Sequence, residues 1–171
     1  CSGCLIRSVR KRIGKELRKQ LILPKSSEKE LTTILVAISG GKDSAVLLET
    51  LHHFLKNRKD VKLIAGCVNE GIKGYRQPSM ECAEKLSETL GIEFKSVSYT
   101  SLGFDEMDNV VELMPKISEK NEEVKGMSPC SFCGVFRRQG INQLANDVNA
   151  DYVALGHNLD DMAQTVLMNL Q

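Results

Sequence analysis

Apolar residues are distributed along this chain in two different patterns. Continuous apolar runs, typical of buried strands, cover residues 31–38, 61–68, 92–99 and 152–155. Apolar residues at helical spacing predict helices over 45–55, 78–90, 105–114, 133–149 and 160–170. Since strands alternate with helices, the pattern predicts an α/β fold, a doubly wound, Rossmann-like parallel sheet with right-handed crossovers.

The segment before the first strand has a different character. Residues 5–23 combine seven basic residues and one acidic residue with apolar positions at helical spacing. They predict a basic amphipathic helix that ends before Pro24, and residues 25–30 follow as a polar linker. We therefore divide the chain into an N-terminal part, 1–30, and an α/β domain, 31–171. The chain begins on Cys1 rather than methionine, so we expect that its N-terminus has been cut or that a segment is missing upstream.

Composition narrows the class of protein. With 171 residues, 42% of them hydrophobic and 26% charged, the chain fits one globular domain with a small appendage and not a disordered protein. No apolar run approaches the ~20 residues of a membrane span, and the basic N-terminal segment lacks the apolar h-region of a secretory signal. The net charge of +1 excludes a basic field over the whole protein. Four of the six cysteines form two C-x-x-C pairs, which favours metal or redox chemistry in the cytoplasm over disulfides.

A glycine turn follows the first strand, with the sequence Ile38-Ser39-Gly40-Gly41-Lys42-Asp43-Ser44. It places backbone N–H groups and a helix N-terminus at the carboxyl end of that strand, where doubly wound sheets bind phosphate. Its spacing differs from that of a Walker loop, which argues against a switch-type NTPase. The turn resembles the S-G-G-x-D-S signature of PP-loop enzymes, which cleave ATP between the α- and β-phosphates to adenylate a substrate. The alternative is an ordinary joint between strand and helix.

A second loop follows the fourth predicted strand, with the sequence Gly156-His157-Asn158-Leu159-Asp160-Asp161. Its two acids could simply cap the helix that begins there. The loop should also lie beside the glycine turn, at the carboxyl edge of the sheet. Two acids facing a phosphate cradle are suited to Mg²⁺, which would bridge them to the phosphates.

The cysteines divide into two groups. Cys130 and Cys133 introduce a helix that carries arginines, which should favour their thiolate forms. Their spacing suits zinc, an iron–sulfur cluster or a redox disulfide, and two thiolates alone do not complete a tetrahedral site. Cys1 and Cys4 resemble half of a zinc knuckle. The other two cysteines, in a strand and a helix, are interpreted as buried small hydrophobes: Cys67 and Cys82.

Nearly the whole chain resembles the TtcA/TtuA group of tRNA 2-thiolation enzymes, and within it the archaeal and eukaryotic cytosolic wobble-uridine thiolases. The resemblance rests on residues 39–44, 70–76, 130–139, 156–161 and 165–169. The Cys-Gly-Val-Phe-Arg-Arg-Gln run at 133–139 is its most specific part, because it separates the wobble-position branch from the branch that acts on the T-loop uridine.

The resemblance implies ATP-dependent replacement of a uridine C2 oxygen by sulfur, at position 34 of tRNA. It implies a [4Fe–4S] cluster held by Cys130, Cys133 and a later cysteine beyond Gln171, with one iron left free for sulfur. Zinc at Cys1 and Cys4 and Mg²⁺ complete its cofactors. Its partners are tRNA and a sulfur donor, either sulfide or a ubiquitin-like sulfur carrier, and a homodimer is compatible with it. The C-terminal part of the domain is expected to be missing.

The resemblance also assigns roles to residues. Asp43 and Asp161 would orient the metal or assist proton transfer, and Arg137 would contact phosphate or substrate. The implied ATP site consists of Ala37, Ser39, Gly40, Gly41, Lys42, Asp43, Ser44, Val68, Arg137, Gly156 and Asp161. Three alternatives stay open: a T-loop uridine-54 thiolase, a persulfide-dependent PP-loop enzyme, and a tRNA-binding module that needs a partner chain.

Overall fold

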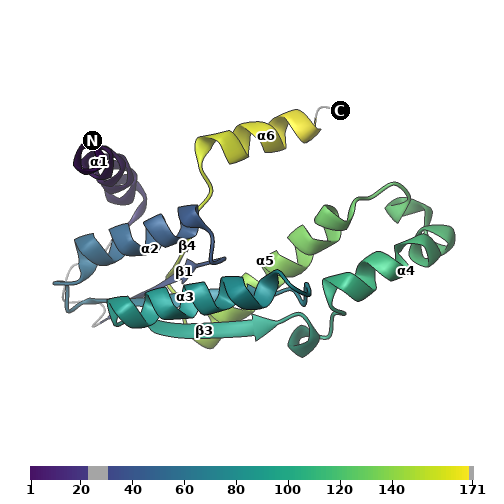
Figure 1. Cartoon of the computed structure of the whole chain (residues 1–171). Helices are drawn as coiled ribbons and strands as arrows, with labels where there is room; N and C mark the ends of the chain where they lie inside the picture. Colours follow the sequence, from purple (N-terminus) through teal and green to yellow (C-terminus); the bar gives the residue numbers. More distant parts are fainter. Residues whose placement is uncertain (23–30, 170–171) are drawn as a thin grey trace.

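A computed structural model of the chain describes residues 1–22 and 31–169 (Figure 1). Four strands form one parallel sheet in the order β3-β2-β1-β4. The strands are β1 (Thr32–Ala37), β2 (Val61–Asn69), β3 (Glu93–Ser98) and β4 (Tyr152–Leu155). The parallel α/β fold expected from the alternating pattern is confirmed, and every strand lies within one residue of the predicted bounds.

The helices are α1 (Ser2–Gln20), α2 (Lys42–Leu55), α3 (Arg76–Leu90), α4 (Met107–Lys120), α5 (Pro129–Asp147) and α6 (Leu159–Asn169), with short 3-10 turns at Thr100–Leu102 and Glu122–Val124. The polar linker predicted at 25–30 lies outside the described residues. No helix within the described ranges is long and apolar enough to cross a bilayer.

Several helix ends differ from the predicted bounds, and the differences are largest at the start of α5 and the end of α4. α5 begins at Pro129, four residues before the predicted start, because proline is well suited to the first turn of a helix. Cys130 therefore lies inside the helix and not before it. α4 continues through Pro115 to Lys120, since this proline removes only one backbone donor from the helix. α3 ends as predicted at Gly91, whose φ of 66° is a left-handed conformation that glycine adopts readily.

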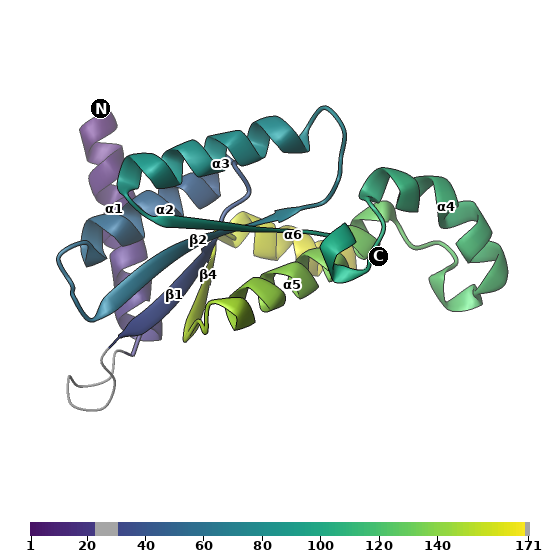
Figure 2. The same cartoon turned by 90° about the horizontal axis from the view of Figure 1, so that it is seen from below.

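The sheet buries both of its faces. In Figures 1 and 2, α2 and α3 cover one face and α5 covers the other. Met107 and Val110 at the start of α4 pack into the core on the α5 side. Alternate residues of β1 serve the two layers: Ile34 and Val36 pack with Leu48 of α2, whereas Leu35 packs with Leu144 of α5. A sheet covered on both sides in this way is the doubly wound arrangement predicted from the sequence.

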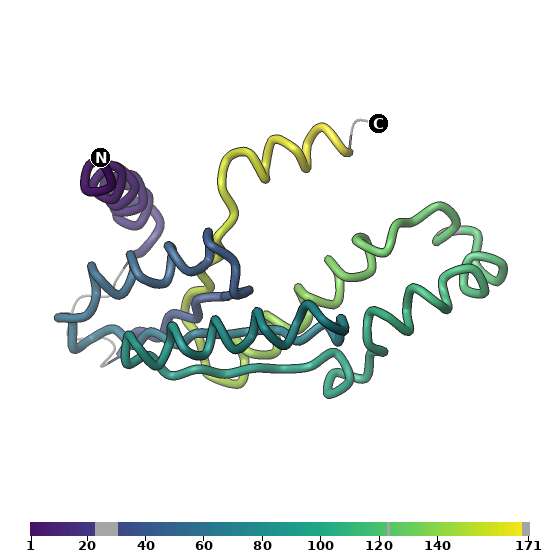
Figure 3. The backbone as a smooth tube through the Cα atoms, in the orientation of Figure 1, coloured from purple at the N-terminus to yellow at the C-terminus, as the bar shows by residue number. Residues whose placement is uncertain are grey.

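Two helices lie outside these layers. Figure 3 shows α1 and α6 beyond α2, on the same side of the sheet. α1 packs on α2, and its Leu17 packs against the edge of the hydrophobic core on the α2 side of the sheet. α6 extends away from the sheet and exposes its apolar side chains, including 82% of Leu159 and 71% of Met168.

Candidate functional site

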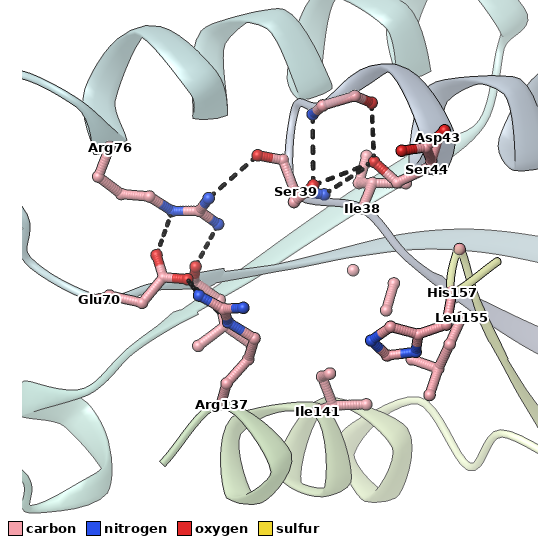
Figure 4. Close-up of a pocket in the computed structure, with 15 residues that line it drawn as sticks. Ile38, Ser39, Asp43, Ser44, Glu70, Arg76, Arg137, Ile141, Leu155 and His157 are labelled. Carbon is pink, nitrogen blue, oxygen red and sulfur yellow. Dashed lines mark hydrogen bonds and ion pairs between the residues drawn. The ribbon is translucent and has the colours of Figure 1, made fainter. Parts of the chain in front are cut away.

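A cavity of about 210 Å³ opens at the carboxyl ends of β1, β2 and β4 (Figure 4). After β1 the chain moves outward to β2 and β3 and then returns to β4 on the other side of β1. Such a reversal of strand order leaves a crevice where doubly wound sheets bind ligands. The cavity is lined by Ala37, Ile38, Ser39, Gly41, Asp43, Ser44, Gly66, Val68, Glu70, Arg76, Arg137, Ile141, Leu155, Gly156 and His157.

The glycine loop holds its own shape through hydroxyl groups. The backbone N–H of Ser39 donates to Ser44 Oγ (3.2 Å), and Ser44 Oγ donates to the carbonyl of Gly41 (3.0 Å). The N–H of Gly41 donates to Ser39 Oγ (3.3 Å), which closes the turn at the start of α2 (Figure 4). The free N–H groups of the first turn of α2 and the helix dipole make this end of the cavity suitable for an anion.

Two glycines of the site lie at close backbone approaches, and the approach is closer at Gly40 than at Gly156. Gly40 has φ +83°, and a Cβ atom there would lie 2.1 Å from the carbonyl oxygen of Ser79 in α3. A Cβ atom at Gly156 would lie 3.1 Å from the nitrogen of Ser44. The loop after β4 therefore sits directly against the glycine loop, as predicted from their positions at the same edge of the sheet.

The charged residues of the two loops lie at the rim of the site. Lys42 Nζ is 2.8 Å from Asp43 Oδ2, and both side chains are largely exposed. The hydrogen bond to Asp43 raises the pKa of Lys42, and the charge of Asp161 acts in the same direction. Asp161 also has the structural role that the sequence left open. Its carboxylate accepts from the N–H of Asn158 (2.8 Å), and its own N–H donates to Asn158 Oδ1 (3.0 Å), a reciprocal cap at the start of α6.

A buried carboxylate, Glu70, joins the cavity to the elements around it. It follows β2 and is 3% exposed. Arg76 Nε lies 2.6 Å from Glu70 Oε2, and Arg137 Nη2 lies 2.9 Å from Glu70 Oε1 (Figure 4). Arg76 also donates to the carbonyls of Ser39 (3.0 Å) and Val68, and to Cys67 Sγ (2.9 Å). One acid and two arginines thus fix β2, the glycine loop and α5 relative to one another.

The cysteine pair of α5 lies next to this network. Cys133 is half-buried, and its carbonyl accepts a hydrogen bond from the Tyr99 hydroxyl (2.9 Å). Arg137, one turn further along α5, places Nη2 3.5 Å from Cys133 Sγ. Burial lowers the pKa of Arg137, but the charges of Glu70, Cys133 and Tyr99 outweigh it, so that the net pKa is raised. Arg137 therefore touches the cavity on one side and the thiol on the other.

The exposed Cys130 and half-buried Cys133 present two thiols in the first turn of one helix. Within the described parts of the chain, no three metal-ligating side chains gather at one place. Because Cys130 is exposed and Cys133 is half-buried, the two thiols could serve as two ligands of an iron–sulfur cluster. The remaining ligands would have to come from another segment. At the other end of the molecule, Cys1 Sγ and Cys4 Sγ are 3.3 Å apart in the first turn of α1. That separation is near the ~3.8 Å between two thiolates on one tetrahedral zinc ion.

The cavity brings together most of the ATP-site residues expected from the sequence. Three residues of that set do not line it: Gly40, Lys42 and Asp161. Sequence reasoning assigned no role to Glu70, Arg76 and His157, although all three belong to motifs singled out there. Cys82 was expected to be buried and is exposed, because it lies on the outer face of α3.

Comparisons with known proteins show the family of the chain. The family model ATP_bind_3, a PP-loop domain, matches residues 9–171. The chain is 37% identical over 170 residues to the tRNA 2-thiolation protein NcsA of Haloferax volcanii, covering 99% of this chain and 50% of that protein. It is 40% identical over 140 residues to the cytoplasmic tRNA 2-thiolation protein 1 of Danio rerio, covering 81% of this chain and 38% of that protein.

A solved structure has the same fold. The U34-tRNA thiolase NcsA from Methanococcus maripaludis, with its [4Fe-4S] cluster, superposes with a TM-score of 0.77 at 36% identity, covering 99% of this chain and 51% of that one. The chain thus spans about half, or less, of the length of these relatives. The glycine loop, its cavity and the match over residues 9–171 lead to one conclusion: the chain belongs to the PP-loop domain family.

Proposed function

We propose that the chain is the ATP-binding part of a tRNA-uridine 2-sulfurtransferase acting at wobble position 34. One observation carries the proposal: Arg137 lines the cavity beside the glycine loop and reaches the thiol of Cys133. A nucleotide in the cavity and sulfur at Cys133 would thereby be adjacent, which the transfer of sulfur to an adenylated base requires. The names of the relatives that cover nearly the whole chain support the same reaction.

ATP would bind with its phosphates on the glycine loop. The N–H groups at the start of α2, the hydroxyls of Ser39 and Ser44, and Lys42 at the rim would hold the triphosphate. The walls at Ala37, Val68 and Gly156 would frame the adenosine. Asp43 and Asp161 are the acids available to hold Mg²⁺ against the phosphates, Asp43 from the cavity wall and Asp161 from the turn that opens α6.

The reaction would proceed in two displacements. The uridine O2 attacks the α-phosphorus of ATP, and pyrophosphate leaves. The resulting C2–O–AMP bond is activated, because AMP is a far better leaving group than the original carbonyl oxygen. A sulfur nucleophile then attacks C2, and AMP departs with that oxygen. Arg137 is positioned to offset the charge that develops on the phosphates in the first step.

Cys130 and Cys133 would provide two ligands of a [4Fe–4S] cluster, with the third from beyond Gln171. When bound, the cluster supplies an iron that can hold the incoming sulfur. Arg137 and the Tyr99 hydroxyl, both in contact with Cys133, would keep its thiol oriented toward that site. Zinc would be held by Cys1 and Cys4 with ligands from outside the described chain. Sulfide or a ubiquitin-like carrier as sulfur donor, a homodimer, and a cytoplasmic location complete the proposal.

The test uses the full-length protein in a strain from which its gene has been deleted. Nuclease digestion of purified tRNA followed by mass spectrometry should show 2-thiouridine at position 34 only when the wild-type protein is restored. Thio-modification confined to position 54 would indicate a T-loop thiolase. Activity in iron-free protein would favour a persulfide mechanism. Absence of ATP–pyrophosphate exchange without a second chain would favour a partner-dependent tRNA-binding module.

A further inference from the structure

A second groove, remote from the cavity, lies between α1 and α2. It has a volume of about 330 Å³ and is lined by Arg7, Arg10, Lys11, Gly14, Arg18, His53 and Phe54. Figures 1 and 2 show α1 crossing α2 near the C-terminal end of α2. We propose that this groove binds the phosphate backbone of an RNA strand; the inference rests on the proposed function, in which the substrate is a tRNA.

The groove exists because the two helices pack closely at one point. Gly14 is the buried residue of α1, and a Cβ atom there would lie only 3.0 Å from the ring of Phe54. The guanidinium of Arg10 is fixed on α2 by an ion pair of 2.6 Å with Glu49. The charge of Arg10 is therefore neutralised by Glu49 within the protein, and this ion pair holds α1 on α2. Together with the contact of Gly14 and Phe54, it fixes the shape of the groove.

The other three basic residues that line the groove are Arg7, Lys11 and Arg18. No acidic side chain is among the described residues that line it. Arg7, Lys11 and Arg18 fall on one face of α1, since positions 7, 11 and 18 are separated by nearly whole turns. They span about 17 Å at 1.5 Å per residue, enough to follow several nucleotides. A chain of net charge +1 thus concentrates positive charge along one groove.

The chemistry of the wall favours RNA over an acidic protein. Guanidinium groups form paired hydrogen bonds with phosphate oxygens. Phe54 leaves 39% of its surface exposed, and His53 lies edge-on to it with ring centroids 5.4 Å apart. Aromatic faces beside a cationic groove are the usual platform on which unpaired bases stack. His53, in the wall of the groove, also lies about 17 Å along α2 from Lys42, where the glycine loop ends and the helix begins. That separation suits a substrate much larger than a nucleotide.

The experiment compares two triple variants that remove the same charge from different faces of α1. The groove variant is Arg7→Gln, Lys11→Gln and Arg18→Gln. The control is Arg12→Gln, Lys15→Gln and Lys19→Gln, which are exposed residues that do not line the groove. Glutamine preserves helix propensity in both. Binding of a fluorescent tRNA transcript to the full-length protein is measured by anisotropy between 0.05 and 0.3 M salt.

The groove variant should bind about 10- to 100-fold more weakly at 0.1 M salt, and its log–log salt slope should fall by about two to three, because each lost phosphate contact removes 0.7–0.9. The control should stay within about threefold, since its three side chains do not line the groove and would make no direct phosphate contact there. Phe54→Leu should weaken binding several-fold without changing the slope, because it removes stacking and no charge. Circular dichroism melting checks that each variant is folded.

Equal losses in the two triple variants, or no loss in the groove variant, would overturn the inference. Loss of binding to an acidic sulfur carrier with tRNA binding intact would overturn it as well. The readout is independent of thiolation. If wild-type protein fails to thiolate tRNA while the groove variant loses RNA binding, the groove stands and the proposed function fails. If thiolation is found and the groove variant binds normally, the reverse holds.

Discussion

Glu70 and Arg76 form an ion pair that is closed to solvent. Arg76 Nε lies 2.6 Å from Glu70 Oε2, and the two side chains are 5% and 4% exposed. The same carboxylate holds Arg137, and Arg76 holds the carbonyl of Ser39 in the glycine loop. The pair therefore connects the nucleotide loop with the helix that carries Arg137 and Cys133.

Replacement of Glu70 by glutamine should destabilise the protein strongly. It leaves the buried guanidinium of Arg76 without a counter-charge, which costs about 3 kcal/mol. The free energy of unfolding, measured with urea, checks this. Glu84→Gln is the matched control, because Glu84 is exposed on α3, and it should change stability by less than about 0.5 kcal/mol. A loss below about 1 kcal/mol for Glu70→Gln would mean that the ion pair of Glu70 and Arg76 contributes little to holding the end of β2 against the glycine loop.

Gly40→Ala should abolish ATP binding. The added Cβ would meet the backbone oxygen of Ser79 at 2.1 Å, so that the glycine loop must move away from α3. Gly103→Ala separates this clash from backbone strain, because Gly103 has the same φ of +83° but open space around its Cα. Both variants should lose about 1 kcal/mol to the left-handed conformation. Only Gly40→Ala should lose nucleotide affinity in equilibrium dialysis; equal affinities in the two variants would contradict the close approach.

The strands and the nucleotide loop could be predicted from sequence because their signals are local. The apolar run at 61–68 and the glycine turn at 39–44 fix a strand and a turn without reference to the rest of the chain. The role of Glu70 could not be predicted in this way, since its partner Arg137 lies 67 positions later and meets it only when α5 packs on β2. Asp161 was ambiguous for another reason, because a carboxylate in the first turn of a helix can cap the helix and bind a cation.

Asp43→Ala should abolish adenylation and leave the fold nearly intact. Asp43 lines the cavity, but half of its side chain is exposed and its ion-pair partner, Lys42, is more exposed still. Such a surface pair contributes at most about 1 kcal/mol to stability. ATP–pyrophosphate exchange and the melting temperature are measured on the same sample. Exchange that persists in the variant would remove Asp43 from the group of residues that hold metal and phosphate.

Cys130→Ala and Cys133→Ala in the full-length protein should each lose iron and thiolation together, while ATP binding at the glycine loop is retained. The two thiols lie in the first turn of α5, and the glycine loop is formed by a different part of the sheet. Cys82→Ala is the control, because Cys82 is an exposed thiol on α3. Iron and acid-labile sulfide are assayed anaerobically. Full thiolation by either variant would make these cysteines structural.

The stability of the protein should fall at alkaline pH, in part through Cys67. Burial raises the pKa of the Cys67 thiol, an effect that the charge of Arg76 opposes only partly. In the unfolded chain the thiol ionises near its ordinary value of about 8.5. Above that pH the unfolded state binds fewer protons than the folded state, so the free energy of unfolding decreases as pH rises. The contribution is fully present below about pH 8.5 and is lost as the pH approaches the raised value. Burial also raises the pKa of Tyr99, which extends the decline above about pH 10.

Cys67→Ala should therefore lower stability at pH 7 by leaving a small cavity, and should also flatten the decline between pH 8.5 and 10. Cys82→Ala, which removes an exposed thiol, should leave the slope unchanged. Urea unfolding at half-unit pH intervals under reducing conditions measures these slopes, and parallel curves for Cys67→Ala and wild type would show that the thiol does not stay protonated in the folded protein.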